Sequence, residues 1–384
     1  MIYLDNAATS FPKPPEVIKE MSRCMLEYCG NPGRGSHKLA FAAAEKIYDC
    51  RVALADLFSA SAPENVIFCQ NATAALNLAI QALARDGAHF ICSDMEHNSV
   101  RRPLEYLVRV KGCIYSIFDS HARDPYRSPV KICRSIASLI RPETVAVIST
   151  ACPNICSQIM PLDEIGALCK KHGVFFIVDG AQGAGHFDIS MERSNISALA
   201  LPGHKGLMGP QGSGALIVSD DFPARPLLYG GSGSASLEPD MPLELPERLE
   251  AGTLSTPAIV GLEAGIKALR GIGLDKISLH EQMLFSKAQR LLSEIPSVTV
   301  YAPRHAGSVI SFNISGLPSD RVANLLSERD ICVRGGFHCN PLAHTALGSD
   351  TSGSVRASFS LFNTADDVYR LAEGVRDIAR GKYR

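Results

Sequence analysis

"GVFFIVDGAQ", residues 173–182, is a run of apolar residues that ends in an aspartate and a glutamine. Because it is apolar at consecutive positions rather than at alternate ones, it predicts a strand buried on both faces, as in a parallel sheet. The run follows "LDEIGALCKKHG" (162–173), which has acids in its first turn, lysines in its last turn and a glycine at its end, a pattern typical of a helix. A helix that leads into a buried strand favours an α/β fold.

The same alternation of helix and strand patterns extends along most of the chain. "NVIFCQ" (65–70) predicts a short buried strand, and "TAALNLAIQALARDG" (73–87) predicts a helix that Gly87 ends. Apolar residues recur in that helix at helical spacing: Leu76, Ile80 and Leu83. We therefore expect a layered α/β fold whose mostly parallel sheet is flanked by helices.

The length of 384 residues exceeds the usual size of one hydrophobic core, so we expect two domains. "GGSGSASLEPDMPLELPERLEAGT" (230–253) predicts a long irregular connection, and a helical pattern follows it. We place a large domain at residues 16–267. A smaller α+β domain would combine residues 1–15 with residues 268–384.

The charge balance is close to zero, with 38 Lys+Arg and 39 Asp+Glu, which argues against a nucleic acid or an anionic membrane as partner. The N-terminus has no signal-peptide pattern, and no apolar run approaches the roughly 20 residues that span a bilayer. We expect a cytoplasmic protein whose twelve cysteines are reduced thiols. Cys92 and Cys169 lie in apolar contexts and predict small core residues.

Two residues that follow predicted strands suggest a site, because ligands of open α/β sheets bind at the carboxyl ends of strands. Asp179 ends the apolar run, where it could hold a cationic ring nitrogen or cap the next turn. Lys205, in "PGHKG", stands between Gly203 and Gly206, which we interpret as room for a bulky covalent adduct. A desolvated lysine can be a nucleophile or a base, although a solvated loop lysine fits the same pattern.

Thr73, in "CQNATAALN", stands where a strand gives way to a helix, so it could bind a phosphate or simply cap the helix. His97, in "DMEHNSVRRPL", follows a predicted strand in a polar loop, where it could stack on a cofactor or lie on the surface. Arg356, in "GSVRASFSLFNT", could clamp a carboxylate or be structural.

Cys339, in "VRGGFHCNPLAHTALG", is the cysteine outside an apolar context. A thiol after two glycines and beside a histidine could be a reactive thiolate on a mobile, glycine-hinged loop. A metal site built from Cys339, His338 and His344 would lack the paired cysteine spacing of zinc sites, so we predict no metal. Together, an aspartate, a lysine, a helix N-terminus and an arginine are the groups with which a pyridoxal-phosphate enzyme binds an amino acid.

Several motifs occur in the order seen in one superfamily: "YLDNAAT", "EHNS", "VDGAQ", "GHKGLMGPQGSGAL", "EAGT", "VRGGFHC" and "VRASFSLFNT". The chain resembles the class V aminotransferase superfamily of fold type I from about residue 3 to residue 380. Within it, the chain most resembles the cysteine desulfurases and selenocysteine lyases whose reactive cysteine lies in an R-x-G-x-H-C context. The resemblance implies a PLP-dependent transferase fold of type I, with pyridoxal 5'-phosphate as cofactor and L-cysteine or selenocysteine as substrate.

The resemblance also implies roles for matching residues. Lys205 would bond covalently to the cofactor, and Cys339 would accept the sulfur as a persulfide, for purposes such as iron–sulfur cluster assembly. Arg356 would bind the substrate carboxylate, with Asn154 and Ala8 beside the substrate. The cofactor-binding residues would be Thr73, His97, Asn154, Asp179, Gln182, His204, Lys205 and Thr253. Among these, Asp179 would hold the pyridine nitrogen, Gln182 the phenolate oxygen, and Thr253 would come from the partner subunit of a homodimer. His97 would stack on the ring and take part in catalysis, and a sulfur-acceptor protein would complete the partners.

The chain departs from the family pattern at three places. Pro202 replaces a serine that helps to bind the phosphate, Ala74 replaces an acidic residue, and "GGFHCNPLAHTALG" replaces the more usual "GHHCA". Three other readings stay open: a PLP-dependent C–S lyase that releases pyruvate, an aminotransferase, and a scaffold without cofactor. A nucleotide-binding dehydrogenase would need GxGxxG before a helix, and neither this motif nor a P-loop occurs.

Overall fold

The computed structural model describes residues 1–33, 35–124, 128–301, 307–349 and 352–382. In this part of the chain the larger sheet has seven strands in the order β2-β8-β7-β6-β5-β3-β4. β8 runs antiparallel to both of its neighbours, and the other pairs are parallel, which confirms the expected mostly parallel sheet. The strands are β2 (Val66–Cys69), β3 (His89–Ser93), β4 (Ile114–Phe118), β5 (Thr144–Thr150), β6 (Phe175–Asp179), β7 (Ala198–Pro202) and β8 (Gly214–Val218).

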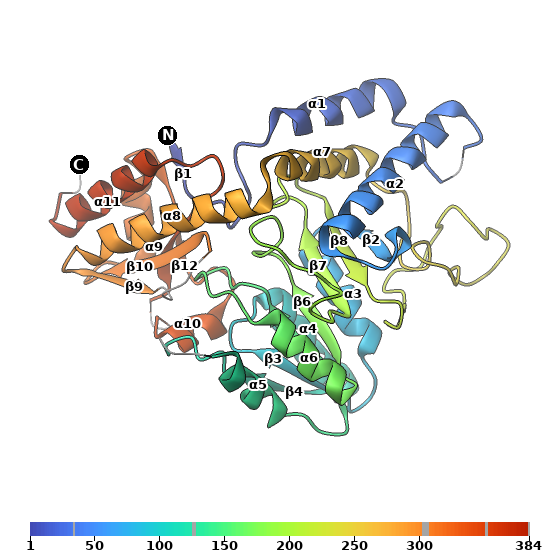
Figure 1. The fold of residues 1–384 in the computed structure, drawn as a ribbon, viewed down its shortest axis with the longest axis horizontal. Helices are drawn as coiled ribbons and strands as arrows, with labels where there is room; N and C mark the ends of the chain where they lie inside the picture. The colour runs from blue at the N-terminus through green and yellow to red at the C-terminus, as the bar shows by residue number, and fades with distance from the viewer. Residues whose placement is uncertain (34, 125–127, 302–306, 350–351, 383–384) are drawn as a thin grey trace.

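Helices cover both faces of this sheet (Figure 1). Phe176 and Val178 of β6 pack into one hydrophobic core, and Ile177 between them packs into the other. The unbroken apolar run therefore has the physical cause that the sequence predicts, burial on both faces. One face is covered by α2 (Lys38–Phe58), α5 (Pro129–Ala137), α6 (Leu162–His172) and α7 (Thr256–Ile272), and the other by α3 (Ala72–Leu83) and α4 (Asn98–Lys111).

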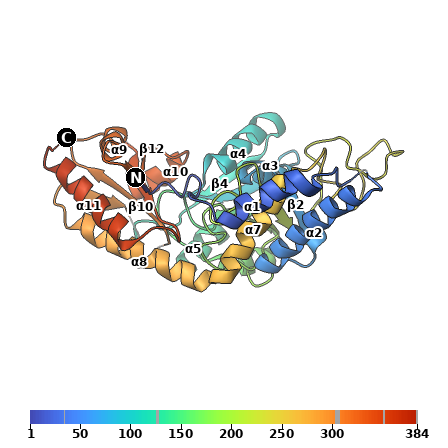
Figure 2. The same ribbon diagram turned by 90° about the horizontal axis from the view of Figure 1, so that it is seen from above.

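A second sheet and core lie at the other end of the molecule (Figures 1 and 2). Among the described residues this sheet has four antiparallel strands in the order β12-β13-β10-β9. Its strands are β9 (Val298–Tyr301), β10 (Val309–Ile314), β12 (Arg334–Gly336) and β13 (Ser354–Ser358). The accompanying helices are α8 (Leu274–Ser293), α9 (Ser319–Ser327), α10 (Pro341–Leu347) and α11 (Ala365–Ala379).

The N-terminal segment joins this second core. β1 (Ile2–Tyr3) pairs in parallel with β11 (Ile331–Cys332), and Figure 1 shows its blue ribbon among the orange and red elements. The chain then leads into α1 (Pro15–Arg23) and the π-helix η1 (Cys24–Tyr28), and the 3-10 helix η2 (Pro63–Asn65) precedes β2. The pairing of β1 with β11 favours, as a proposal, a division into residues 16–267 and residues 1–15 with 268–384, although α7 continues past residue 267 to Ile272 and Leu269 packs in the core of the larger sheet.

One helix ends earlier in the structure than the sequence predicts. α3 ends at Leu83 instead of continuing to Gly87, because Ala84 is extended and the chain turns toward β3. Gly87 still has a left-handed backbone, with φ of 71°, but it belongs to that turn. The predicted irregular connection at residues 230–253 is confirmed, since neither helix nor strand occurs between β8 and α7.

None of the twelve cysteines, all of which lie in the described residues, forms a disulfide, and Cys92 and Cys169 are buried as predicted. Among the described residues, the helices are too short or too polar to cross a membrane.

Candidate active site

One pocket opens at the carboxyl ends of the central strands of the larger sheet. Asp179 is the last residue of β6, and Lys205 lies three residues beyond the end of the neighbouring β7. The pocket brings together seven of the residues singled out from the sequence: Thr73, His97, Asn154, Asp179, Gln182, His204 and Lys205. Residues far apart in the chain therefore meet where an open α/β sheet binds its ligands.

The Asp179 carboxylate is buried at 2% exposure, and its Oδ1 accepts a hydrogen bond from the Ala181 N–H at 2.9 Å. The capping role that the sequence left open is therefore real. Burial raises the pKa of Asp179, while the bond from Ala181 and the charge of Lys205 oppose that shift. In the described residues no cation forms a salt bridge with Asp179, so this carboxylate can accept a positively charged ligand atom.

Lys205 projects from the turn after β7 into the same pocket. Burial is the main cause that lowers its pKa to about 8, and the nearby Arg356 adds to the effect, while Asp179 and Asp5 oppose it. A lysine with a pKa near 8 is partly neutral at neutral pH, so it can serve as nucleophile or base.

The glycines around Lys205 serve the backbone and not the adduct, so our interpretation of them was wrong. A Cβ on Gly203 would lie 2.1 Å from the Ser213 Oγ, and a Cβ on Gly206 would lie 2.2 Å from the Ala184 carbonyl oxygen. The turn that carries Lys205 is pressed against neighbouring backbone, which side chains would displace. This close packing fixes the position of the Lys205 backbone, from which the side chain extends.

Two neutral histidines border the pocket. His97 is the N-cap of α4, where its Nδ1 accepts from the Ser99 N–H at 3.1 Å, so the ring proton lies on Nε2. Burial, followed by the charge of Lys205, lowers the pKa of both His97 and His204 to about 4. The His204 Nδ1 is buried without a hydrogen-bond partner among the described residues, so its hydrogen-bonding capacity is unused within this chain.

Thr73 lies in the first turn of α3, but it does not cap the helix. The N-cap is Asn71, whose side chain accepts from the Ala74 N–H at 2.9 Å. The simple capping alternative for Thr73 is therefore wrong. With Asn71 and Ala72, Thr73 lines the pocket at the N-terminus of a helix, a setting that suits a phosphate.

Gln182 and Ala8 come together through the N-terminal segment. The Gln182 Nε2 donates to the Ala7 carbonyl at 2.8 Å, so one amide hydrogen of Gln182 is already used. Ala8 follows directly, and its N–H donates to the Asp5 carbonyl at 3.0 Å. The bond from Gln182 to Ala7 ties the start of the chain to the loop that follows β6.

Cys339 is exposed and lines a hollow of about 310 Å³ that adjoins the pocket. Pocket and hollow share Thr73, His97 and Ser99. The expected glycine hinge is wrong, since Gly335 and Gly336 belong to β12 and pair with β13. A Cβ on Gly335 would lie 2.6 Å from the Ser319 carbonyl oxygen, so that glycine permits close packing.

Arg356 is buried in β13, and two hydrogen bonds hold its guanidinium. Its NH2 donates to the Asp5 carboxylate at 2.6 Å, and its NH1 donates to the Asn154 carbonyl at 3.2 Å. The Arg356 Nε has no partner among the described residues. Asn154 in turn contacts both Arg356 and the turn that carries Cys339, because its Nδ2 donates to the His338 carbonyl at 2.8 Å.

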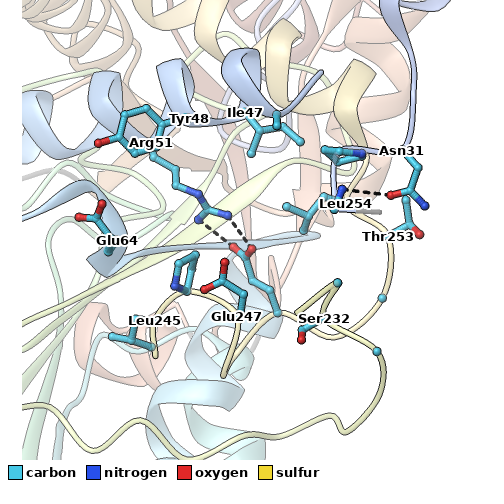
Figure 3. A pocket seen from close by; sticks show the side chains of 18 residues that line it. Asn31, Ile47, Tyr48, Arg51, Glu64, Ser232, Leu245, Glu247, Thr253 and Leu254 are labelled. Atoms are coloured by element: carbon cyan, nitrogen blue, oxygen red, sulfur yellow. Dashed lines mark hydrogen bonds and ion pairs between the residues drawn. The ribbon is translucent and has the colours of Figure 1, made fainter. Parts of the chain in front are cut away.

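Thr253 does not line the Lys205 pocket. It borders a different pocket of about 320 Å³, where Figure 3 shows it close to Asn31. The segment before it is anchored by Glu250, whose carboxylate accepts two hydrogen bonds from Arg51. Figure 3 draws both bonds as the dashed lines that leave the labelled Arg51. Within one chain Thr253 therefore lies in a pocket that is separate from the pocket with Lys205.

Sequence reasoning missed two residues that shape the site. Asp5 pairs with Arg356, and Asn340 bonds to Asn154 at 3.0 Å. Asp5 lies inside "YLDNAAT" and Asn340 is part of a noted departure from the family pattern, so both were visible. Their partners lie 351 and 186 residues away in sequence, which no local pattern reveals.

The fold is that of type I, the class to which the PLP-dependent cysteine desulfurases belong, and it places Lys205 and Asp179 at the ends of adjacent strands. The model of the aminotransferase class-V family matches residues 2–371. The chain belongs to this family, and its relatives there are cysteine desulfurases.

Several cysteine desulfurases are similar to this chain over nearly their whole length. A protein of Pyrococcus abyssi named probable cysteine desulfurase is 34% identical, over 96% of this chain and 92% of its own. A protein of the same name from Methanothermobacter thermautotrophicus is 31% identical, over 98% and 94%. The apo structure of a cysteine desulfurase from Thermococcus onnurineus NA1 superimposes with a TM-score of 0.90 at 32% identity, covering 99% of this chain and 95% of that one.

Proposed function

We propose that this chain is a PLP-dependent cysteine desulfurase that converts L-cysteine to L-alanine and transfers the sulfur to Cys339 as a persulfide. The observation that carries the proposal is that the pocket with Lys205 adjoins the hollow with Cys339. The pocket with Lys205 and Asp179 shares Thr73, His97 and Ser99 with the hollow that Cys339 lines. An exposed thiol thus stands at the entrance of a site suited to an amino acid.

The residues of the pocket fit pyridoxal phosphate. Asp179 is a buried carboxylate without an ion-pair partner in the described residues, which suits a protonated pyridine nitrogen. The unpartnered His204 Nδ1 and the N-terminus of α3 with Thr73 suit a phosphate. Gln182 would hold the phenolate oxygen, and His97 would lie against the ring. When bound, the cofactor supplies an electron sink for the substrate Cα.

Lys205 has two tasks in this proposal. Its amine would hold the cofactor covalently before substrate arrives, and it would then accept the proton from the substrate Cα. Its pKa of about 8 suits both tasks, since a fraction of the amine is neutral near pH 7 and the base is matched to the operating pH. His97 is neutral at that pH, so it adds no positive charge beside Lys205.

The sulfur step belongs to Cys339. Its thiolate would attack the substrate sulfur, so that an S–S bond forms while the Cβ–S bond of the substrate breaks. The electron pair of the broken bond stays on the carbon skeleton, which takes up a proton and leaves as alanine. Cys339 keeps the second sulfur as a persulfide, and a selenocysteine substrate would react in the same way with selenium.

Substrate orientation would depend on Arg356 and Asn154. The buried guanidinium has an unpartnered Nε in the described part of the structure, and such a group binds a carboxylate strongly. Ala8 would border the same substrate, because Ala7 beside it contacts Gln182.

The proposal includes a homodimer in which Thr253 reaches the phosphate site of the partner subunit. Support comes from the position of Thr253 in a separate pocket and from apolar residues exposed on nearby segments, such as Leu228, Tyr229 and Leu237. A cytoplasmic location, which twelve reduced thiols favour, and a sulfur-acceptor protein complete the proposal.

A single-turnover assay with L-cysteine tests this function. Alanine, pyruvate and protein-bound persulfide would be measured in the PLP-loaded wild type, in Cys339→Ala and in Cys29→Ala. Cys29 is the matched control because it is also an exposed thiol, but on the segment after η1. We expect alanine and persulfide in the wild type and in Cys29→Ala, and loss of both in Cys339→Ala.

Pyruvate with free sulfide, unaffected by Cys339→Ala, would make the chain a C–S lyase instead. Formation of a keto acid with transfer of the amino group would make it an aminotransferase. Either outcome would leave Cys339 as a loop thiol without a role in the reaction.

A further inference from the structure

Cys339 occupies the exposed tip of a turn whose neighbours on both sides are buried. His338 is 5% exposed and Asn340 is 0% exposed. His338 and Cys339 both have left-handed backbones, with φ of 51° and 57°. Two consecutive residues with side chains persist in that conformation only where their surroundings hold them there. The contacts of this turn must therefore be strong.

Those contacts reach the turn from the larger sheet and from β13. The His338 ring donates through Nε2 to the Ser354 carbonyl at 2.9 Å, and burial lowers the pKa of this histidine to about 3, which keeps it neutral. The His338 carbonyl accepts from the Asn154 Nδ2 at 2.8 Å, and the Cys339 carbonyl accepts from the Asn98 N–H at 2.9 Å.

Asn340 makes the remaining contacts, and it uses its whole amide to do so. Its Nδ2 donates to the Met95 carbonyl and to the Asn154 Oδ1, each at 3.0 Å. Its Oδ1 accepts from the Ala343 N–H at 3.3 Å and caps α10. Met95 and Asn154 both line the pocket with Lys205. Asn340 thus joins the turn of Cys339 directly to two residues that line that pocket, Met95 and Asn154.

We propose that Asn340 is a positioning residue that docks the Cys339 turn onto Asn154 and Met95 and so fixes the thiol relative to the substrate. The inference rests on the proposed function, in which Cys339 receives the sulfur and Asn154 lies beside the substrate.

The contact also couples substrate binding to the turn. The Asn154 side chain accepts from Asn340 and donates to the His338 carbonyl, so both ends of its amide hold the turn. A substrate carboxylate that draws on this amide competes with the His338 carbonyl. Binding of substrate and position of the turn then affect each other by the same free energy.

Two variants of Asn340 separate docking from helix capping. In Asn340→Ser the hydroxyl can still cap α10, but it is too short to reach Met95 and Asn154. In Asn340→Ala both the cap and the docking contacts are lost. The PLP-loaded wild type and both variants would be compared by hydrogen exchange of the peptides covering residues 334–340 and 341–348, with a β5 peptide as folding control.

We expect exchange in residues 334–340 to accelerate about fivefold or more in both variants, since two hydrogen bonds are lost in each. Exchange in residues 341–348 should accelerate only in Asn340→Ala. Persulfide formation on Cys339 in a single turnover should slow about tenfold or more in both, because a displaced nucleophile reacts poorly. The visible spectrum of the bound cofactor should stay unchanged.

Unchanged exchange in residues 334–340 would overturn the inference, as would acceleration in Asn340→Ala alone, which would leave only a helix cap. Faster exchange with an unchanged rate of persulfide formation would also overturn it, because docking would then not position the thiol. If the wild type forms no persulfide, the proposed function fails, whereas the exchange measurement still decides whether Asn340 docks the turn.

Discussion

The Arg356 guanidinium donates to the Asp5 carboxylate at 2.6 Å, which joins β13 to the N-terminal segment. Arg356 is buried and Asp5 is partly exposed, so the carboxylate balances a charge that would otherwise be costly to bury. Because the Arg356 NH1 also donates to the Asn154 carbonyl, the orientation of the guanidinium is fixed before a substrate arrives. Its Nε is buried without a partner among the described residues, and we propose that a substrate carboxylate is bound by this guanidinium.

The first prediction concerns the Arg356 guanidinium. Arg356→Lys should raise the KM for L-cysteine about 10- to 100-fold, because a lysine ammonium cannot keep the orientation that the contacts with Asp5 and Asn154 give the guanidinium. The kcat and the visible spectrum of the bound cofactor should change little. Steady-state kinetics check this, with Arg290→Lys on the exposed face of α8 as control. A fall in kcat with an unchanged KM would show that Arg356 does not bind the substrate carboxylate.

The second prediction concerns the pH dependence of cofactor attachment. Burial, aided by Arg356, lowers the pKa of Lys205 to about 8, and only the neutral amine can attack an aldehyde. The rate at which the cofactor-free protein binds PLP covalently should rise about tenfold per pH unit below pH 8 and level off above it. Stopped-flow absorbance measures that rate.

Asp179→Asn provides the control for Lys205, because the Asp179 carboxylate is the main influence that raises the Lys205 pKa against burial. The midpoint of the pH profile should therefore move to lower pH in this variant. A rate that does not depend on pH in either protein would contradict the lowered pKa.

The placement of Lys205 and Asp179 followed from local sequence, whereas their surroundings did not. A run that is apolar on both faces and ends in an aspartate predicts a central strand and its carboxyl end, and β6 has that place. The reason for Gly203 and Gly206 depends on Ser213 and Ala184, which approach only in the folded chain. Helix ends, such as that of α3, depend on where the next strand lies.

The third prediction concerns Glu96, a fully buried carboxyl group beneath the pocket. Its Oε1 accepts from the Thr150 N–H at 2.7 Å and from the Ser93 hydroxyl, and its Oε2 has no partner among the described residues. Burial raises the pKa of Glu96 from 4.5 to about 8, and the nearby Asp179 adds to this. This shift favours the protonated form of Glu96 in the folded protein at neutral pH.

The sign of the effect on stability follows from proton binding. Between pH 4.5 and about pH 8 the folded state binds a proton at Glu96 that the unfolded state releases, so a rise in pH lowers stability. Glu96→Gln keeps the accepting oxygen and removes this penalty. Urea unfolding should show a gain for Glu96→Gln that is larger at pH 8 than at pH 5, by about 2 to 4 kcal/mol. An equal effect at both pH values would indicate an ionised Glu96.

The last prediction concerns Thr253 and the proposed dimer. Thr253→Ala should weaken PLP binding about 10-fold or more, because a hydrogen bond to a charged phosphate is lost. Equilibrium titration of the cofactor-free protein with PLP measures this. Arg51 and Glu250 hold the segment before Thr253 by two hydrogen bonds, so the substitution should leave the local backbone in place.

A mixed dimer decides which subunit supplies the threonine. When a Thr253→Ala subunit pairs with a Lys205→Ala subunit, the one site that retains Lys205 receives Thr253 from the other chain. That site should bind PLP with wild-type affinity if the residue acts across the interface. It should bind as weakly as the Thr253→Ala homodimer if Thr253 acts within its own chain. Because Thr253 borders a pocket that excludes Lys205, we expect full restoration in the mixed dimer.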